Sequence, residues 1–182
     1  MEIEQGKVLI AQPLLNDGHF KRTVILLSEY NEYGSMEFVM NKPLHIYLKD
    51  VLPDLPDMLY PLYYGGPVAQ NQLFFIHKAG KKIKNSLPIS GKFFWGGDFE
   101  DVLKLLQAKE ITGSEIKFFV GYSGWEPEQL KNEMEQKAWF LTDADYNNLM
   151  NESPVEIWGN ELKKMGNNYA VFTNFPEEPS LN

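Results

Sequence analysis

The hydrophobic pattern changes period partway along the chain, and this change most strongly limits the fold. In residues 1–97, short apolar runs such as residues 23–28 (TVILLS) alternate with turn signals, as buried strands do. From Asp98 onward, strand-like runs alternate with segments whose apolar residues recur at helical spacing. This order predicts an α+β fold with a mixed β-sheet, and it argues against a doubly wound parallel sheet.

The first half contains most of the expected strands. They cover residues 6–12, 22–29, 35–41, 62–64, 72–77 and 93–95. Gly34 can supply the positive φ of a tight turn, so residues 22–41 predict a β-hairpin. Pro43 is expected to end the second hairpin strand, because proline cannot donate to the ladder. The proline-rich residues 44–61 predict an irregular connection with one or two helical turns.

Helix signals dominate the second half, around one further strand at residues 116–120. Asp98 stands at an N-cap position, and Pro127 is suited to the first turn of a helix. Thr142 and Asp145 predict a short capping box that opens a further helix. Residues 153–156 (SPVE) predict another helix start, and Gly166 is expected to end that helix.

Nothing in the sequence divides the chain into separate domains. The 182 residues contain no internal repeat and no long linker. We therefore expect a single compact domain over residues 1–175, followed by a loose C-terminal tail over residues 176–182 that contains two prolines.

Cysteine usage and hydropathy restrict the compartment and the chemistry. The chain has no cysteine, which excludes disulfides, cysteine-ligated zinc or iron–sulfur sites and a thiol nucleophile. The N-terminal residues do not resemble a secretory signal, and no apolar run approaches the ~18 residues of a membrane span. These features predict a cytoplasmic protein without membrane contact.

The net charge of −8 is unevenly distributed. Residues 1–125 carry 13 basic and 14 acidic side chains, whereas residues 126–182 carry 4 basic and 11 acidic ones, a net charge of −7. Arg22 is the only arginine, although arginine is the residue that most often reads guanine in DNA. The charge and composition therefore argue against direct nucleic-acid binding.

One basic cluster is the exception. Its members are Lys78, Lys81, Lys82 and Lys84. The cluster is a candidate nucleic-acid contact, with aromatic residues just upstream that could stack on bases. The simpler interpretation is an exposed hairpin tip whose lysines protect a sheet edge.

Residues 121–125 (GYSGW) lie between an expected strand and an expected helix, as a hydrolase nucleophile elbow does. The G-x-S-x-G motif would require glycine where Trp125 stands, and all three histidines precede Ser123. A tight turn is therefore the preferred interpretation. The alternative is a small hydrolase-like enzyme that uses Ser123 or a distributed His/Asp site. No local metal motif occurs, and we expect no cofactor or metal.

A second glycine motif is Gly65-Gly66-Pro67. Its backbone N–H groups could approach an anionic ligand, as they do in an anion nest. The simpler interpretation is a turn that leads into the next strand.

Several segments carry a family resemblance that runs in order over nearly the whole chain. They are residues 6–13 (GKVLIAQP), then Asp17, Phe20, Arg22 and Val24, residues 40–44 (MNKPL), residues 65–68 (GGPV) and residues 121–125 (GYSGW) with Gln129, Leu130 and Glu133. Together they resemble the YqgE/AlgH family of bacterial proteins. The chain departs from the family pattern at Lys42, where arginine is usual, and at Glu128, where glycine is usual. Ser123 stands where the family commonly has alanine, which argues against a nucleophile there.

The resemblance implies a compact α+β domain with a mixed, partly barrel-like sheet surrounded by helices. Family members are labelled transcriptional regulators, largely by association with alginate control in one member. We therefore expect a cytoplasmic binding or regulatory protein that contacts an unidentified protein or small-molecule ligand without direct DNA readout. The sequence does not indicate its oligomeric state.

The residues expected to contribute to such a ligand site lie in the family motifs. They are Asp17, Arg22, Asn41, Gly65, Gly66, Pro67, Tyr122 and Trp125. The sequence assigns no catalytic residue among them.

Overall fold

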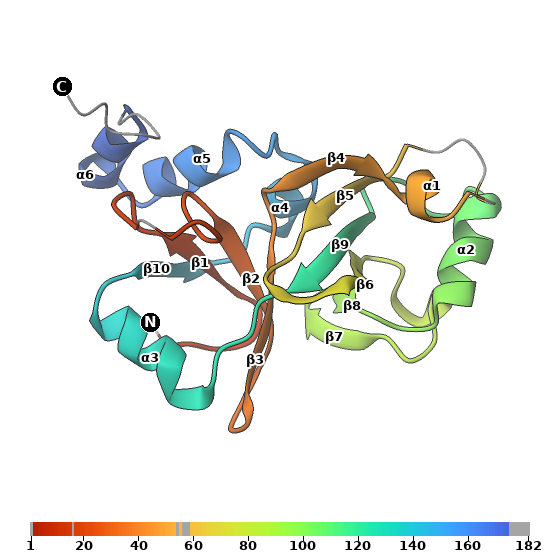
Figure 1. Ribbon diagram of the computed structural model, residues 1–182, viewed down its shortest axis with the longest axis horizontal. Helices are drawn as coiled ribbons and strands as arrows, with labels where there is room; N and C mark the ends of the chain where they lie inside the picture. Colours follow the sequence, from red (N-terminus) through yellow and green to blue (C-terminus); the bar gives the residue numbers. More distant parts are fainter. Residues whose placement is uncertain (1, 16, 54, 56–58, 175–182) are drawn as a thin grey trace.

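The strands form two sheets that meet near the middle of the molecule (Figure 1). The structure is a computed structural model that describes residues 2–15, 17–53, 55 and 59–174. The smaller sheet has the order β10-β1-β2-β3, with β1 at Lys7–Ala11, β2 at Val24–Asn31, β3 at Gly34–Val39 and β10 at Trp139–Asp143. All of its strand pairs are antiparallel.

The larger sheet has the order β4-β5-β9-β6-β8-β7. Its strands are β4 (Pro43–Tyr47), β5 (Pro61–Tyr64), β6 (Val68–His77), β7 (Leu87–Ser90), β8 (Phe93–Trp95) and β9 (Ile116–Tyr122). The pair β5–β9 is parallel and the other pairs are antiparallel. The predicted α+β fold with a mixed sheet is confirmed, although in the described residues the strands form two open sheets and not a closed barrel.

Helices cover both sheets (Figure 1). The helices are α1 (Leu48–Val51), α2 (Phe99–Gln107), α3 (Pro127–Glu135), α4 (Tyr146–Asn151), α5 (Ile157–Lys164) and α6 (Asn167–Ala170), with 3₁₀ turns at Gly80–Lys82 and Val171–Asn174. One face of the smaller sheet packs in a core with residues of α4, α5 and the larger sheet, and the other packs in a core with Leu130 of α3. The second face of the larger sheet packs in a core with residues of α1 and α2.

Burial on both faces explains the sequence of β2. Its residues Val24–Leu27 are fully buried, because even-numbered and odd-numbered positions enter different cores. A strand buried on both faces has a continuous apolar run in place of an alternating one.

The two sheets are joined through their backbones. Glu37 donates its N–H to the carbonyl of Ser123 (2.9 Å) and accepts the N–H of Ser123 (2.8 Å). On either side, Ser35 donates to the carbonyl of Trp125 (3.1 Å) and Val39 donates to the carbonyl of Gly65 (2.9 Å). We call residues 35–39, 65–66 and 121–125 the sheet junction.

Glycine is required where the strands of the junction approach each other. A Cβ on Gly65 would lie 2.1 Å from the carbonyl oxygen of Gly121, and a Cβ on Gly66 would lie 2.3 Å from the Oγ of Ser123. Real Cβ atoms do not approach other atoms so closely, so the two glycine motifs of the sequence have a steric role in the fold.

Most of the expected strands and helices are confirmed, including the β2–β3 hairpin. The capping box expected at Thr142 and Asp145 is wrong in its first residue, because Thr142 lies in β10 and Asp145 is itself the N-cap, which accepts the N–H of Asn148. The expected irregular connection after Pro43 is wrong in its first residues, because Pro43 begins β4 at the edge of the larger sheet. An edge strand tolerates proline, since one side of its backbone needs no ladder partner. The sequence also missed β7, β10 and α6.

Two local expectations are corrected. The lysine-rich segment is not a hairpin tip, because it contains the 3₁₀ turn Gly80–Lys82 between β6 and β7, and these two strands each pair with β8. The helix expected from Ser153 begins at Ile157, after a turn in which Glu156 donates its N–H to the carbonyl of Ser153. The expected tail over residues 176–182 lies outside the described residues.

We predict that Gly65→Ala lowers the free energy of unfolding by about 3 kcal/mol or more, because the new Cβ overpacks the junction. Chemical denaturation of the purified variant measures this loss. Gly113→Ala is the matched control, since its new Cβ would meet nothing closer than Tyr60 Cε1 at 3.8 Å. Equal stability of the two variants would show that the close approach at Gly65 is unimportant.

Candidate functional site

The residues expected to form one ligand site lie in three different parts of the structure. Asn41 lines a pocket beside β4 and β5, with Asp17 in the turn next to it. Gly65 and Gly66 are buried in the sheet junction, and Pro67 is exposed beside them. Tyr122 and Trp125 line a separate groove. These residues therefore do not converge on one concave surface.

The pocket beside β4 and β5 is lined by two histidines, and we call it the His19–His45 pocket. Its volume is about 480 Å³. Residues that line it include His19, Asn41, Lys42, Leu44, His45 and Tyr64. Two histidines, a lysine, an amide and a phenol thus face a shared space, and none of its lining residues is acidic.

The first wall of this pocket is a turn that Asp17 holds in place. Asp17 Oδ1 accepts the backbone N–H groups of His19 (2.7 Å) and Phe20 (3.1 Å). The His19 ring then stacks on Tyr64, and His19 Nδ1 lies 2.7 Å from the Tyr64 hydroxyl. Lys42 Nζ donates to the carbonyl of His19 at 2.7 Å. This bond links the turn to the segment of Asn41 and Lys42, which forms the second wall of the pocket.

Asn41 holds the second wall. Its Oδ1 accepts the N–H of Val24 (2.9 Å), and its Nδ2 donates to the carbonyl of Arg22 (2.9 Å) and that of Pro154 (3.5 Å). Arg22 does not belong to the lining described for this pocket: its guanidinium carbon lies 4.9 Å from the centroid of the Trp158 ring. Asn41 and Arg22 therefore position the loops around the pocket.

Ser123 has no geometry for nucleophilic attack. It is fully buried, and its Oγ donates to the carbonyl of Gly65 at 3.3 Å. The described hydrogen bonds pair Ser123 with no histidine.

His77, the buried histidine, accepts the N–H of Ala79 at Nδ1 and lies 3.1 Å from the carbonyl of Gly96 at Nε2, which assigns the proton to Nε2. Burial lowers its pKa.

A histidine–serine pair does occur elsewhere, at His77 and Ser86. The Ser86 Oγ lies 3.0 Å from His77 Nε2 and donates its own proton to the carbonyl of Ile83 (2.7 Å). His77 Nε2 carries a proton in this arrangement, so it cannot accept the proton of Ser86. The pair is a structural contact.

Tyr122 and Trp125 lie in a shallow groove beside the β2–β3 turn. The groove has a volume of about 420 Å³ and is also lined by Tyr33, Met36 and Glu126. The indole N–H groups of Trp125 and Trp139 both donate to Glu133 Oε2, at 2.9 and 2.8 Å. Glu133 thus fixes the tryptophans of the core beneath α3.

The four lysines of the basic cluster do not form one uniform surface. Lys78 Nζ lies 5.2 Å from the centroid of the Phe93 ring, and Lys82 forms an ion pair with Glu110 at 3.1 Å. Lys81 and Lys84 line a surface groove with Phe94. Nucleic-acid contact at this cluster stays a prediction.

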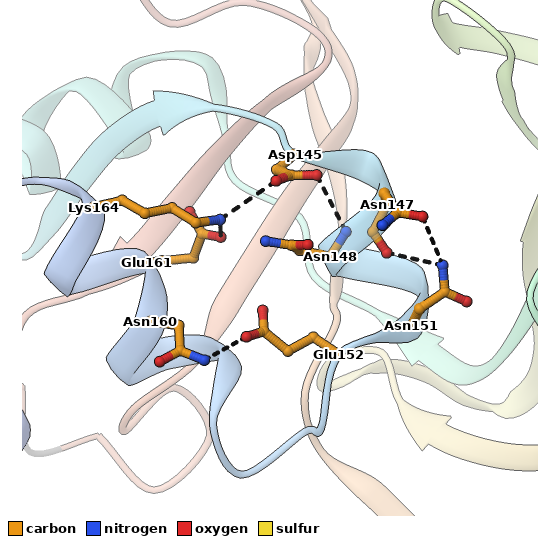
Figure 2. Close-up of polar contacts among 8 residues, drawn as sticks. All are labelled: Asp145, Asn147, Asn148, Asn151, Glu152, Asn160, Glu161 and Lys164. Carbon is orange, nitrogen blue, oxygen red and sulfur yellow. Dashed lines mark hydrogen bonds and ion pairs between the residues drawn. The ribbon is translucent and has the colours of Figure 1, made fainter.

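Several carboxylates of the acidic C-terminal third are used inside the α4–α5 layer (Figure 2). Asp145 caps α4 and lies 3.5 Å from Lys164 Nζ, which also contacts Glu161 Oε1 at 2.6 Å. Glu152 accepts a hydrogen bond from the Asn160 amide. The negative charge of this third is therefore partly neutralised or hydrogen-bonded within the fold.

Besides Glu161, which pairs with Lys164, sequence reasoning missed two buried charged residues. Glu37, in the junction, has 0% exposure, and neither carboxyl oxygen has a hydrogen-bond partner by distance and angle. Burial raises the pKa of Glu37 to about 9; the Ser35 hydroxyl partly opposes this shift and the Glu133 carboxylate adds to it. The alternating pattern of β3 places Glu37 on the face of the strand that points away from Phe38. In the structure that face is also covered, by α3.

The second missed residue is Lys117 of β9, which is 6% exposed. Its Nζ donates to the carbonyls of Met40 (2.9 Å) and Leu149 (3.0 Å). Burial lowers the pKa of Lys117 to about 7. The signal in the sequence was a lysine in the middle of a strand that is otherwise apolar, residues 116–120 (IKFFV).

Within the described ranges, no group of three or more His, Asp or Glu side chains is arranged to hold a metal ion. The same residues contain no helix with the length and hydrophobicity needed to cross a bilayer.

Comparisons with known proteins agree on one family. The model of the AlgH-like family matches residues 8–170. A UPF0301 protein of Cytophaga hutchinsonii is 38% identical over 181 residues, which are 99% of this chain and 100% of the relative. A UPF0301 protein of Bacteroides fragilis is 40% identical over 182 residues, with 98% of this chain and 91% of the relative covered.

Solved structures show the same fold. The solution structure of the AlgH protein from Pseudomonas aeruginosa is 29% identical, has a TM-score of 0.75 and covers 98% of this chain and 100% of its own. The crystal structure of protein DIP2367 from Corynebacterium diphtheriae has a TM-score of 0.77 at 23% identity and covers 96% of this chain and 94% of its own.

We predict that Glu37 makes stability depend on pH. The folded-state pKa of about 9 lies above the ordinary value of 4.5, so folding favours the protonated acid. The contribution is complete below about pH 4.5 and is lost as the pH rises through 9. Glu37→Gln, which stays neutral, should therefore gain stability relative to the natural protein as the pH rises, by at most about 1.4 kcal/mol per pH unit.

Urea denaturation at several pH values measures this difference. Glu135→Gln, on the exposed end of α3, is the control for the loss of one carboxylate outside the core. A flat difference for Glu37→Gln would contradict the burial of an ionisable acid at this position.

Proposed function

The chain belongs to the AlgH-like family, and we propose that it is a cytoplasmic binding protein that holds a small anionic ligand in the His19–His45 pocket without catalysing a reaction. A regulatory role through this ligand, without direct DNA readout, agrees with the description of family members as transcriptional regulators. The observation that carries the proposal is the lining of the pocket. His19, Lys42 and His45 provide nitrogen groups, Tyr64 provides a hydroxyl, and none of the lining residues is acidic.

The chemistry of these groups favours an anion. An ammonium group, a phenol and imidazole nitrogens can donate hydrogen bonds to carboxylate or phosphate oxygens. Hydrogen bonds in which one partner is charged are the stronger ones. A ligand that carries a carboxylate or a phosphate therefore fits this pocket better than a cation does.

The rigidity of the walls supports the same proposal. Asp17 accepts two N–H groups within its own turn, and Asn41 bonds to Val24 of β2 and to the loop carbonyls of Arg22 and Pro154. Arg22 and His45 have positive φ angles of 53° and 57°, a region that residues other than glycine seldom occupy. Strained backbone of this kind persists where the surroundings hold it, and it is frequent at binding sites.

We predict that a panel of small carboxylates, phosphate esters and nucleotides contains a compound that shifts backbone amide signals of residues 18–19, 41–42, 44–45 and 64 in a saturable way. Tyr64→Phe combined with His19→Ala should weaken that binding about tenfold, because both hydrogen-bonding groups are removed. Two-dimensional NMR of the labelled chain measures the shifts.

Tyr63→Phe is the matched control, since neighbouring residues of a strand point to opposite faces and Tyr63 is not part of this pocket. Shifts that map to other surfaces, or a panel with no saturable response, would contradict the proposal.

A further inference from the structure

A second pocket lies at β5 and β9, next to Met150 of α4, and we call it the Lys117 pocket. Its volume is about 280 Å³. It is lined by apolar side chains that include Leu59, Ile116 and Met150, together with Tyr60, Tyr63 and Lys117. None of the residues that line the His19–His45 pocket lines this one.

Lys117 is buried without a counter-charge among the described residues. Its Nζ contacts the carbonyls of Met40 and Leu149 and lies 4.1 Å from the centroid of the Tyr63 ring. All three groups are neutral, and the described ion pairs do not include Lys117. A buried charge is normally paired with an opposite charge, because removal from water costs several kcal/mol per ion.

We propose that the Lys117 pocket is a binding site for a small monocarboxylate. The carboxylate would supply the counter-charge that Lys117 lacks, and the apolar body of the acid would lie against Leu59, Ile116 and Met150. The position of Lys117 on a face that is otherwise apolar, next to a pocket, distinguishes this residue from the exposed lysines of the chain.

The lining selects the class of ligand. Lys117 is the only cation among the residues of the pocket, so a dianionic phosphate would retain one buried negative charge that no cation neutralises. Beside these polar groups, Leu59, Ile116 and Met150 offer contacts to a hydrocarbon body. Of the remaining titratable groups, Tyr60 and Tyr63 have pKa values that burial raises, and Glu115 acts on Tyr60. Both phenols therefore stay neutral, and the Tyr63 hydroxyl can donate a hydrogen bond to the ligand.

Protonation is linked to binding at such a site. Burial lowers the pKa of Lys117 to about 7, so near neutral pH the unoccupied protein is a mixture of ammonium and amine. A bound carboxylate favours the ammonium form. The affinity for a carboxylate should consequently fall as the pH rises through this region, whereas the affinity for a neutral analogue of the same shape should not change.

The test uses benzoate and its neutral analogue benzamide with the full chain, and the methyl signal of Met150 reports occupancy in ¹³C NMR spectra. We expect saturable binding of benzoate at about pH 6, about tenfold weaker binding of benzamide, and loss of benzoate affinity by about pH 8.5. Lys117→Met keeps the length of the side chain and should bind the two compounds equally. Lys104→Met, on the exposed face of α2, should behave as the natural chain does.

Lys117 also links the end of β3 to α4, so a variant at this position can change the fold. The comparison of benzoate with benzamide, and its pH dependence, is therefore made first on the unaltered chain. Equal affinity for the two compounds, a benzoate affinity that does not change with pH, or no saturable shift of Met150 would each overturn the proposal.

Discussion

Backbone hydrogen bonds between β3 and the segments around Gly65 and Ser123 hold the two sheets together, and the rest of the structure depends on this contact. The carbonyls of Gly65, Ser123 and Trp125 all accept N–H groups of β3. Such bonds form only when two backbones lie within hydrogen-bonding distance, and Gly65, Gly66 and Gly121 make that approach possible. The two glycine motifs are thereby explained by packing, and neither needs a catalytic role.

The junction also borders both proposed ligand sites. β5 lies between β4 and β9 and leads into the junction at Gly65, and its last two residues, Tyr63 and Tyr64, line the Lys117 pocket and the His19–His45 pocket respectively. The two pockets therefore share one strand, and each has its own basic groups. If both proposed sites bind their ligands, the rigid strand between them provides a physical connection.

Much of the fold could be predicted from local patterns, and most of the site could not. The apolar run of β2 and the helix start at Asp98 depend on near neighbours in the chain, so they are visible in the sequence. β4 and β10 are stabilised by strands far away in sequence, since Trp139 of β10 lies opposite Ala11 of β1. The burial of Glu37 and Lys117 likewise depends on layers that come from distant segments. Of the residues expected at a ligand site, Gly65 and Gly66 pack in the junction, and only Asn41 lines the pocket that we propose.

Hydrogen exchange at the junction tests most directly whether the two sheets form one cooperative unit. The amides of Glu37, Val39 and Ser123 should exchange only by global unfolding, with the same free energy as the amides of Leu26 in β2 and Phe119 in β9. Exchange of the junction amides at a clearly lower free energy, while Leu26 and Phe119 stay protected, would show that the sheets separate before either one unfolds. That result would contradict the structural role assigned here to the glycine motifs.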